Sequence, residues 1–271
     1  MATAETDTPE DAAGLFDTHC HFECAEEEIG GMLDRAGAAG VAALVAVGGS
    51  DALNRGVWAA SRVAADARSQ GRHVPDVLRA VGWDRDQAAT PFGDLPPLDL
   101  GGVCAVGEIG LDYYYEGAAR AAQRDLFSRQ LELAAQQSLP VIIHTREADD
   151  DTLGILHEIP SRGIIHCFTG SVAFCRALLD LGFFVSISGI VTFRAADNVR
   201  EAALAIPEDR LLIETDAPFL APVPLRGRPN EPAFIVHTAR FLAELRGVAL
   251  PALAAATNAN ARRVFSSPDM A

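Results

Sequence analysis

The chain has 271 residues, of which 49% are hydrophobic and 22% charged, so it can form one TIM-type barrel of about 250 residues or two smaller domains. Its formal net charge of −15 at pH 7 excludes proteins that coat long nucleic-acid duplexes, because these need a basic surface. No apolar run reaches the roughly 18 residues of a membrane-spanning helix, and the five cysteines form no CxxC pair. We therefore expect a cytoplasmic protein with reduced thiols.

We expect one folded domain over residues 14–266, because no linker-like stretch divides it. Residues 1–13 contain several acids, no base and no apolar stretch. They are expected to form a disordered acidic tail rather than a signal or transit peptide. Residues 267–271 are expected to form a short C-terminal tail.

Short apolar, β-branched runs alternate with longer alanine- and leucine-rich stretches of helical period. The runs predict eight strands, at Leu15–Phe22, Val41–Gly49, Val77–Trp83, Val103–Asp112, Leu139–Thr145, Gly163–Phe168, Phe183–Val191 and Arg210–Asp216. The stretches predict helices at Glu27–Ala39, Ala52–Ser69, Ala118–Gln137, Asp150–Glu158, Ala173–Leu181, Ala195–Leu204, Glu231–Arg246 and Pro251–Phe265. Eight such units favour a parallel (β/α)₈ barrel, with an open doubly wound sheet as the alternative. Three prolines between Asp84 and Leu100 predict an irregular connection there.

The first predicted strand ends in the sequence Asp17-Thr18-His19-Cys20-His21. Strand side chains alternate between faces, so His19 and His21 project the same way and can clamp one metal ion. Cys20 should face the opposite side as a small core residue, as should Cys167 beside His166. An HxH pattern alone is equally compatible with a structural role.

Further ionisable residues end other predicted strands, each directly after apolar residues. They are Glu108, His144, His166 and Asp216. Each alone could be a hydrogen-bonded core histidine or a helix cap. Burying such a group without a partner costs several kcal/mol, so six of them at the C-terminal face of one barrel indicate a shared partner, which divalent cations supply. Glu214, on the same face as Asp216, is expected to orient a histidine.

Four histidines and two carboxylates exceed the three protein ligands of a typical mononuclear catalytic zinc site. We therefore expect two divalent cations with a bridging anion. The chain contains no lysine, which excludes a carbamylated lysine as the bridge, and we assign this role to Glu108. Imidazole-rich ligation suits zinc, manganese, cobalt or nickel better than magnesium, although mixed occupancy stays open.

Together these motifs make the sequence resemble the TatD family of metal-dependent deoxyribonucleases, which belongs to the amidohydrolase-like barrels. The matching motifs run in family order and include DTHCH (Asp17–His21), GEIGLDYYY (Gly107–Tyr115), LPVIIHTREA (Leu139–Ala148), HCFTGS (His166–Ser171), SGIVTF (Ser188–Phe193), ETDAPFLAP (Glu214–Pro222) and RPNEP (Arg228–Pro232). The resemblance implies one metal held by His19, His21, Glu108 and Asp216, and another held by Glu108, His144 and His166. It also implies cleavage of DNA, often from the 3′ end of single strands, or of RNA, and D-aminoacyl-tRNA deacylation has been attributed to the family.

One segment departs from the family pattern. Where the family usually carries Gly-x-His-Pro, this chain has Gly82-Trp83-Asp84-Arg85. The missing histidine is expected to lie near the substrate phosphate, which Asp84 would repel. The departure leaves metal binding unaffected but leaves the choice of substrate open.

The leading hypothesis is a deoxyribonuclease or exonuclease in which a metal-activated water attacks phosphorus. Asp216 would orient or deprotonate that water. Arg146, Arg226 and Arg228 are candidate phosphate clamps, with surface ion pairs as the alternative for each. One ring of Tyr113–Tyr115 could stack on a terminal base, while at least two of the three are expected to pack within their loop.

Two other hypotheses stay open. An ester or amide hydrolase, such as a D-aminoacyl-tRNA deacylase, would use the same metals, and Asp84 would then recognise an amino group. A barrel with a purely structural metal would act through partners. We expect a nucleic-acid substrate (strand ends or tRNA), no membrane contact and no obligate protein partner. His73, His157 and His237 are expected on the surface.

Overall fold

The computed structural model describes residues 14–115 and 117–266, so the expected tails lie outside the described residues. The strands are β1 (Leu15–Cys20), β2 (Val41–Gly49), β3 (Asp76–Trp83), β4 (Ala105–Asp112), β5 (Val141–Arg146), β6 (Gly163–Ile165), β7 (Phe184–Ile187) and β8 (Leu211–Ile213). The α-helices are α1 (Glu26–Ala38), α2 (Asp51–Ser69), α3 (Arg120–Gln136), α4 (Asp149–Glu158), α5 (Val172–Asp180), α6 (Asp197–Ala205), α7 (Ile235–Arg246) and α8 (Leu250–Phe265). The 3₁₀ helices are η2 (Arg85–Ala89), η3 (Phe92–Asp94), η4 (Gly189–Thr192), η5 (Glu208–Arg210) and η6 (Pro232–Phe234). In the described part of the chain, no helix is both long and apolar enough to cross a membrane.

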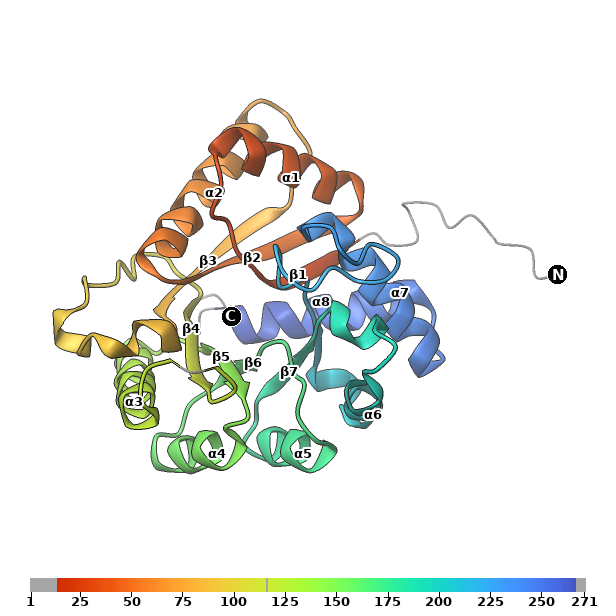
Figure 1. Cartoon of the computed structure of the whole chain (residues 1–271). Helices are drawn as coiled ribbons and strands as arrows, with labels where there is room; N and C mark the ends of the chain where they lie inside the picture. Colours follow the sequence, from red (N-terminus) through yellow and green to blue (C-terminus); the bar gives the residue numbers. More distant parts are fainter. Residues whose placement is uncertain (1–13, 116, 267–271) are drawn as a thin grey trace.

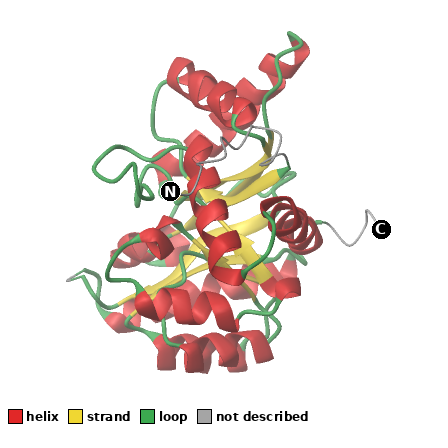
Figure 2. Cartoon of the chain, turned by 90° about the vertical axis from the view of Figure 1, so that its right-hand side faces the viewer, coloured by secondary structure: helices red, strands yellow, loops and turns green. Residues whose placement is uncertain are grey.

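The eight strands form one parallel sheet in which sequence neighbours pair in order from β1 to β8. The sheet joins its own edge, because Cys20 forms a parallel bridge with Ala217 just after β8, and the His21 amide donates to the Ala217 carbonyl (2.7 Å). Figures 1 and 2 show the helices packed around this barrel. The predicted (β/α)₈ barrel is confirmed, and the open sheet was the wrong alternative.

The late strands are shorter than predicted. β6 ends at Ile165 and β8 at Ile213, so His166, Glu214 and Asp216 begin loops instead of ending strands. The backbone leaves the extended conformation here, since Asp216 has a φ of 57°, in the left-handed region. The β3–β4 connection holds only η2 and η3, in agreement with the irregular connection that its prolines predict.

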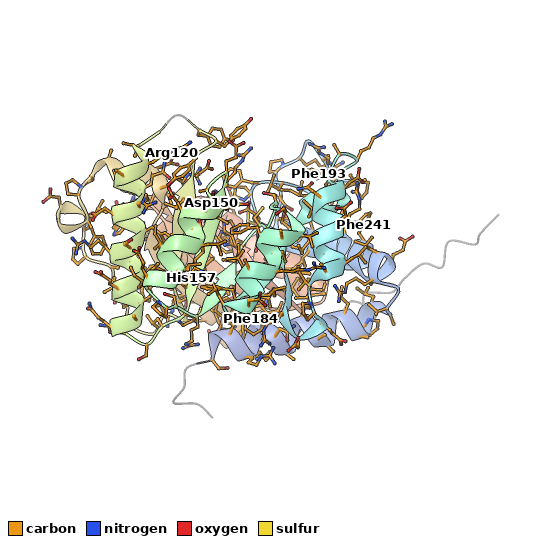
Figure 3. The ribbon with its side chains drawn as sticks, turned by 90° about the horizontal axis from the view of Figure 1, so that it is seen from below. Arg120, Asp150, His157, Phe184, Phe193 and Phe241 are labelled. Carbon is orange, nitrogen blue, oxygen red and sulfur yellow. The ribbon has the colours of Figure 1, made fainter. Side chains whose placement is uncertain are left out.

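Apolar side chains from all eight strands form one buried cluster inside the barrel. It includes Phe16, Val45, Ala80, Ala105, Ile142, Ile164, Phe184 and Leu212. The last turn of α8 packs against this cluster, and the Phe265 ring stacks on Phe16 with ring centroids 6.3 Å apart. In Figure 3, Phe184 lies beside α8, while Arg120 and Phe193 lie on the opposite side of the barrel. Helix α8 therefore closes the N-terminal end and leaves the C-terminal end to polar side chains.

Two strands change register just below the polar end. On an unbroken strand, residues three positions apart, such as Ala105 and Glu108, would face opposite sides. The pairing of β1 with β2 shifts between Asp17 and Cys20, and that of β4 with β5 shifts between Val106 and Ile109. Such an irregularity adds one residue to the strand. It lets Ala105 pack inside the barrel and Glu108 face the same interior.

Candidate metal centre

The first group of donor atoms comes from β1, β4 and the loop after β8. The Nε2 atoms of His19 and His21 lie 3.0 Å apart, and Oε2 of Glu108 lies 3.5 Å from each of them. Oδ1 of Asp216 lies 3.7 Å from both imidazole nitrogens. Four donor atoms from three places in the sequence therefore converge on one point.

The second group lies on the other side of Glu108. Nδ1 of His144, on β5, lies 3.1 Å from Nε2 of His166. Oε1 of Glu108 lies 3.4 Å from the former and 3.5 Å from the latter. Each oxygen of the Glu108 carboxylate thus faces a different group of imidazoles, which is the geometry of a carboxylate that can bridge two cations.

The donor atoms have the chemistry and spacing of a site for divalent cations. Within each of two sets of three residues, all ligand atoms lie within 4.8 Å of one another. One set is His19, His21 and Asp216, and the other is Glu108, His144 and His166. Nε2 of His19, which faces the centre, has one imidazole nitrogen and two carboxylate oxygens within 3.0–3.7 Å. Imidazole with carboxylate suits a transition metal such as zinc or manganese, so these residues could hold metal.

Burial decides which of these groups carry charge. It lowers the pKa of His19 to about 3 and raises the pKa of Asp216 well above its usual value, in the latter case together with nearby carboxylates. Burial also opposes charge on His166, but Glu108 and Glu214 offset it and raise the pKa of His166 well above its ordinary value. The protein alone therefore concentrates partly uncompensated carboxylates and imidazoles in a small volume, which favours a bound cation.

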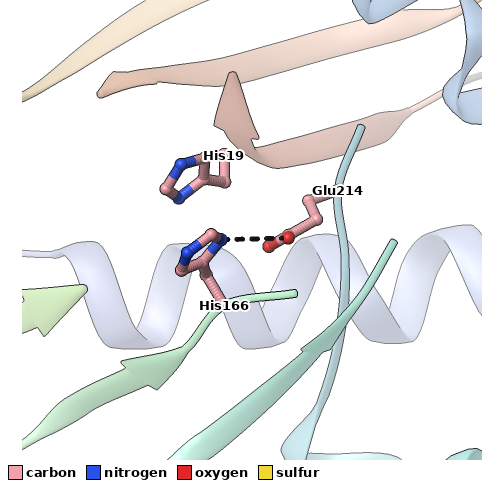
Figure 4. Close-up of side chains that lie close together, drawn as sticks. All are labelled: His19, His166 and Glu214. Atoms are coloured by element: carbon pink, nitrogen blue, oxygen red, sulfur yellow. Dashed lines mark hydrogen bonds and ion pairs between the residues drawn. The ribbon is translucent and has the colours of Figure 1, made fainter. Parts of the chain in front are cut away.

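Glu214 lies behind His166, where it can orient the imidazole as the sequence predicts. Its Oε1 lies 3.3 Å from Nδ1 of His166 and accepts a hydrogen bond from the Cys167 amide (2.7 Å). Figure 4 shows this pair beside His19, whose ring stacks on that of His166 with centroids 3.9 Å apart. Glu214 is fully buried.

Two aspartates near the site were given no role by the sequence reasoning. Oδ2 of Asp112 lies 3.2 Å from Nε2 of His144, so Asp112 can orient His144 as Glu214 orients His166. Asp17 accepts hydrogen bonds from the Thr215 amide (2.9 Å) and hydroxyl (2.6 Å), which ties β1 to the loop after β8. Burial raises the pKa of Asp17 to about 7. The sequence could have indicated Asp17 and Asp112 by their position in the same motifs as the predicted metal ligands.

The predicted phosphate clamps lie in the segments that follow β5 and β8. The Arg146 guanidinium is half-buried, with Cζ 3.6 Å from the Tyr114 ring centroid and 5.1 Å from that of Tyr115. Arg226 is exposed and stacks over Phe193 at 3.9 Å, and Arg228 is also exposed. Within residues 14–115 and 117–266, none of the three arginines forms an ion pair with a carboxylate. The alternative of surface ion pairs therefore finds no support there.

The packing of Tyr113, Tyr114 and Tyr115 differs from the prediction. Tyr113 packs and donates a hydrogen bond to Asp151 (2.6 Å), but Tyr114 and Tyr115 are 53% and 56% exposed. The prediction that at least two of the three pack within the loop was wrong, because the two outer rings hold the Arg146 guanidinium instead.

The other residues for which the sequence made a prediction are two cysteines and three histidines. Cys20 is buried and its thiol donates to the Val45 carbonyl (3.4 Å), while Cys167 is only half-buried and lies against the Ser188 hydroxyl (3.2 Å). His73 and His157 are exposed. His237 is half-buried against the Phe234 ring, so its predicted surface position holds only in part.

The sequence profile of the family described as "TatD related DNase" matches residues 16–266. This chain belongs to that family. It is 35% identical over 93% of its length to a Bacillus subtilis protein named "Uncharacterized metal-dependent hydrolase YabD", 98% of which is covered. It is 48% identical over 60% of its length to the Escherichia coli protein named "Uncharacterized metal-dependent hydrolase YcfH". That match spans 63% of YcfH, which is less than two thirds of it.

A further TatD-family relative, from Klebsiella pneumoniae, is named "3'-5' ssDNA/RNA exonuclease TatD". It is 42% identical over 60% of this chain and 65% of its own length. Among solved structures, the TatD homologue YjjV of Escherichia coli is similar with a TM-score of 0.74 and 28% identity, covering 95% of this chain and all of YjjV. A TatD-family hydrolase from Entamoeba histolytica has the same fold, with a TM-score of 0.81, 19% identity and coverage of 94% and 98% of the two chains.

Proposed function

We propose that this TatD-family chain is a metal-dependent hydrolase that holds two divalent cations and cleaves phosphodiester bonds of single-stranded DNA or RNA. One observation carries the proposal: the two oxygens of Glu108 face two separate groups of imidazoles, at 3.4–3.5 Å. His19, His21 and Asp216 would hold one cation with Glu108, and His144 and His166 would hold the other. The names of the relatives, metal-dependent hydrolases and a 3'-5' ssDNA/RNA exonuclease, support this assignment.

When bound, the cations supply Lewis-acid polarisation of a phosphoryl oxygen and make a nearby water more acidic. Asp216 is the residue we assign to orient the attacking water. Its Oδ1 faces the first group of donors, and its Oδ2 is the atom that receives the proton.

The surroundings of the site favour an anionic substrate that carries rings. Arg146 and Arg226 have no carboxylate partner among the described residues, although the chain has an excess of acids. Guanidinium groups bind phosphate through two parallel hydrogen bonds. The exposed faces of Tyr114 and Tyr115 offer surfaces on which bases stack without sequence preference. A single strand presents both its phosphates and its unpaired bases, whereas a duplex hides the latter.

The proposal is tested by incubating manganese- or zinc-loaded protein with end-labelled single-stranded DNA, RNA and a blunt duplex. We expect cleavage of the single strands, and a loss of about 10³-fold or more in His144→Ala and Asp216→Asn. The matched controls are His157→Ala and Asp150→Asn, both on the exposed surface of α4, which should cleave like the unmodified protein.

Two results would overturn the proposal. One is the absence of any cleavage that depends on His144 and Asp216. The other is hydrolysis of aminoacyl-tRNA in preference to phosphodiesters in a parallel assay, which would assign the same centre to an ester substrate.

A further inference from the structure

We propose that Arg85, the first residue of η2, binds a phosphate of the substrate beside the metal centre and is a catalytic residue of the reaction. The inference rests on the proposed function and adds to it a residue in the segment where the sequence departs from the family pattern.

Arg85 reaches the metal centre from the loop after β3. Its Nη1 lies 3.8 Å from Oε1 of Glu108, and its Nη2 lies 3.9 Å from Oδ2 of Asp112. These carboxylates are the ones that contact His144. The guanidinium therefore lies beside the second group of donors, and its side chain is 21% exposed, so a ligand can reach it.

Among the described residues, the Arg85 guanidinium has carboxylates nearby but forms no hydrogen bond with them. Its buried Nε lies 3.4 Å from Oδ1 of Asp86, an ion pair without hydrogen-bond geometry, and the distances to Glu108 and Asp112 also exceed those of hydrogen bonds. A partly buried cation with five donors needs acceptors to compensate for lost water. Glu108 already faces two groups of imidazoles with its two oxygens. A phosphate offers several oxygens in a geometry that the planar guanidinium matches.

The backbone before Arg85 is held by hydrogen bonds from both sides. The buried Gln130 side chain of α3 accepts from the Trp83 amide and donates to the Trp83 carbonyl, both at 2.7 Å. The Asp84 amide donates to the Gly49 carbonyl at the end of β2 (2.8 Å). The Trp83 ring is 3% exposed and packs with Ala88 and Leu126. This anchoring gives Arg85 a fixed direction toward the site, as a pre-organised anion contact requires.

The carboxylate of Asp84 has a local structural role. Its Oδ1 accepts hydrogen bonds from the Asp86 amide (2.9 Å) and the Gln87 side chain (3.3 Å), so Asp84 caps the short helix that Arg85 begins. The sequence predicts that Asp84 would repel a substrate phosphate, and this stays a prediction. The structure adds that Asp84 caps η2 and that its neighbour Arg85 turns a positive charge toward the centre.

The test separates phosphate binding from a merely structural ion pair. Inorganic phosphate would be titrated calorimetrically into metal-loaded protein, for the unmodified chain and for Arg85→Gln and Arg85→Lys. Metal affinity would be measured in the same preparations by chelator competition. Arg129→Gln is the matched control, because Arg129 is 55% exposed on α3 and pairs only with surface acids among the described residues.

We expect the phosphate dissociation constant to rise about 10- to 100-fold in Arg85→Gln and less in Arg85→Lys, which keeps the charge but loses the fork. Metal affinity should stay within about twofold, and Arg129→Gln should match the unmodified protein. An unchanged phosphate affinity in Arg85→Gln overturns the inference. So does a loss of metal affinity that accounts for the loss of phosphate binding, since Arg85 would then only position Glu108 and Asp112.

The same preparations distinguish this inference from the proposed function. If phosphate binding depends on Arg85 but no oligonucleotide is cleaved, Arg85 is confirmed as an anion-binding residue while the nuclease proposal fails. Should Arg85→Gln not fold, as judged by circular dichroism, Arg85→Lys carries the test, because it retains the charge beside Glu108. A phosphate affinity of Arg85→Lys equal to that of the unmodified protein then overturns the inference.

Discussion

Glu214 supports His166 from the side away from Glu108, with its Oε1 3.3 Å from Nδ1 of the imidazole. The same oxygen accepts a hydrogen bond from the Cys167 amide, so the carboxylate is fixed between a side chain and the backbone of one loop. A histidine whose second nitrogen faces a carboxylate has a fixed ring orientation and is a more basic ligand. Nε2 of His166 is thereby left to face Glu108.

The first prediction follows from this contact. Glu214→Gln keeps the volume of the side chain but removes its negative charge, so the metal affinity should fall about 10- to 100-fold. Chelator competition measures the change. Glu132→Gln, at an exposed position of α3, is the control and should bind metal like the unmodified protein. Equal affinities in the two variants would show that Glu214 does not act through His166.

The second prediction concerns removal of metal. The centre buries several carboxylates and imidazoles within a few ångströms, and a ligand that binds only the folded state stabilises it by about 2.7 kcal/mol at 100 times its dissociation constant. Adding zinc or manganese to chelator-treated protein should therefore raise the melting temperature by about 5–10 °C. The rise should be smaller in His144→Ala and complete in His157→Ala. An equal rise in both variants would place the stabilising metal elsewhere.

The sequence alone was sufficient for the barrel and for part of the centre. His144 and His166 each follow an interior isoleucine, Ile142 and Ile164, by two positions, so the alternation of strand side chains predicts their direction. Glu108 follows interior Ala105 by three positions, and only a register shift brings both to the same side. That shift depends on pairing with a neighbouring strand, which no local pattern records.

The contacts of Arg85 and Asp112 could not be predicted from the sequence, for a different reason. Arg85 lies in a segment with no helical or strand period, where contacts depend on which elements pack over the loop. Its position is set by Gln130, 45 residues later in the sequence, and by the end of β2. Asp112 is the last residue of β4, but its pairing with His144 follows from the register of β4 with β5, not from spacing.

The third prediction tests the clamp on Trp83. Gln130→Leu leaves the Trp83 amide and carbonyl without their partner in a buried place, at a cost of about 1–3 kcal/mol for each unsatisfied group. The free energy of unfolding, measured with urea, should therefore fall by about 2–6 kcal/mol. Gln136→Leu, on the exposed surface of the same helix, should change it by less than about 0.5 kcal/mol. A small effect of Gln130→Leu would mean that water replaces the clamp.

The fourth prediction concerns pH. Burial, and then the nearby Glu108 and Asp86, raise the pKa of Asp84 to about 6 from its ordinary value of 3.8. The folded protein therefore binds this proton more tightly than the unfolded chain, so stability falls as pH rises from about 4 to 6 and is constant above that range. Asp84→Asn removes this loss and keeps an acceptor for the helix cap. The stability of the variant minus that of the unmodified protein should rise by about 1–3 kcal/mol between pH 4 and pH 6.

Urea unfolding of metal-free protein at several pH values measures this difference directly. Asp66→Asn is the control, because Asp66 is exposed on α2 and its substitution should give a difference nearly independent of pH. The sign is decisive. If Asp84 were held ionised by Arg85, the unmodified protein would gain stability relative to Asp84→Asn as the pH rises, which is the opposite of the expected trend. A rise confined to pH 4–6 supports instead a half-buried helix cap whose negative charge lowers the stability of the folded protein.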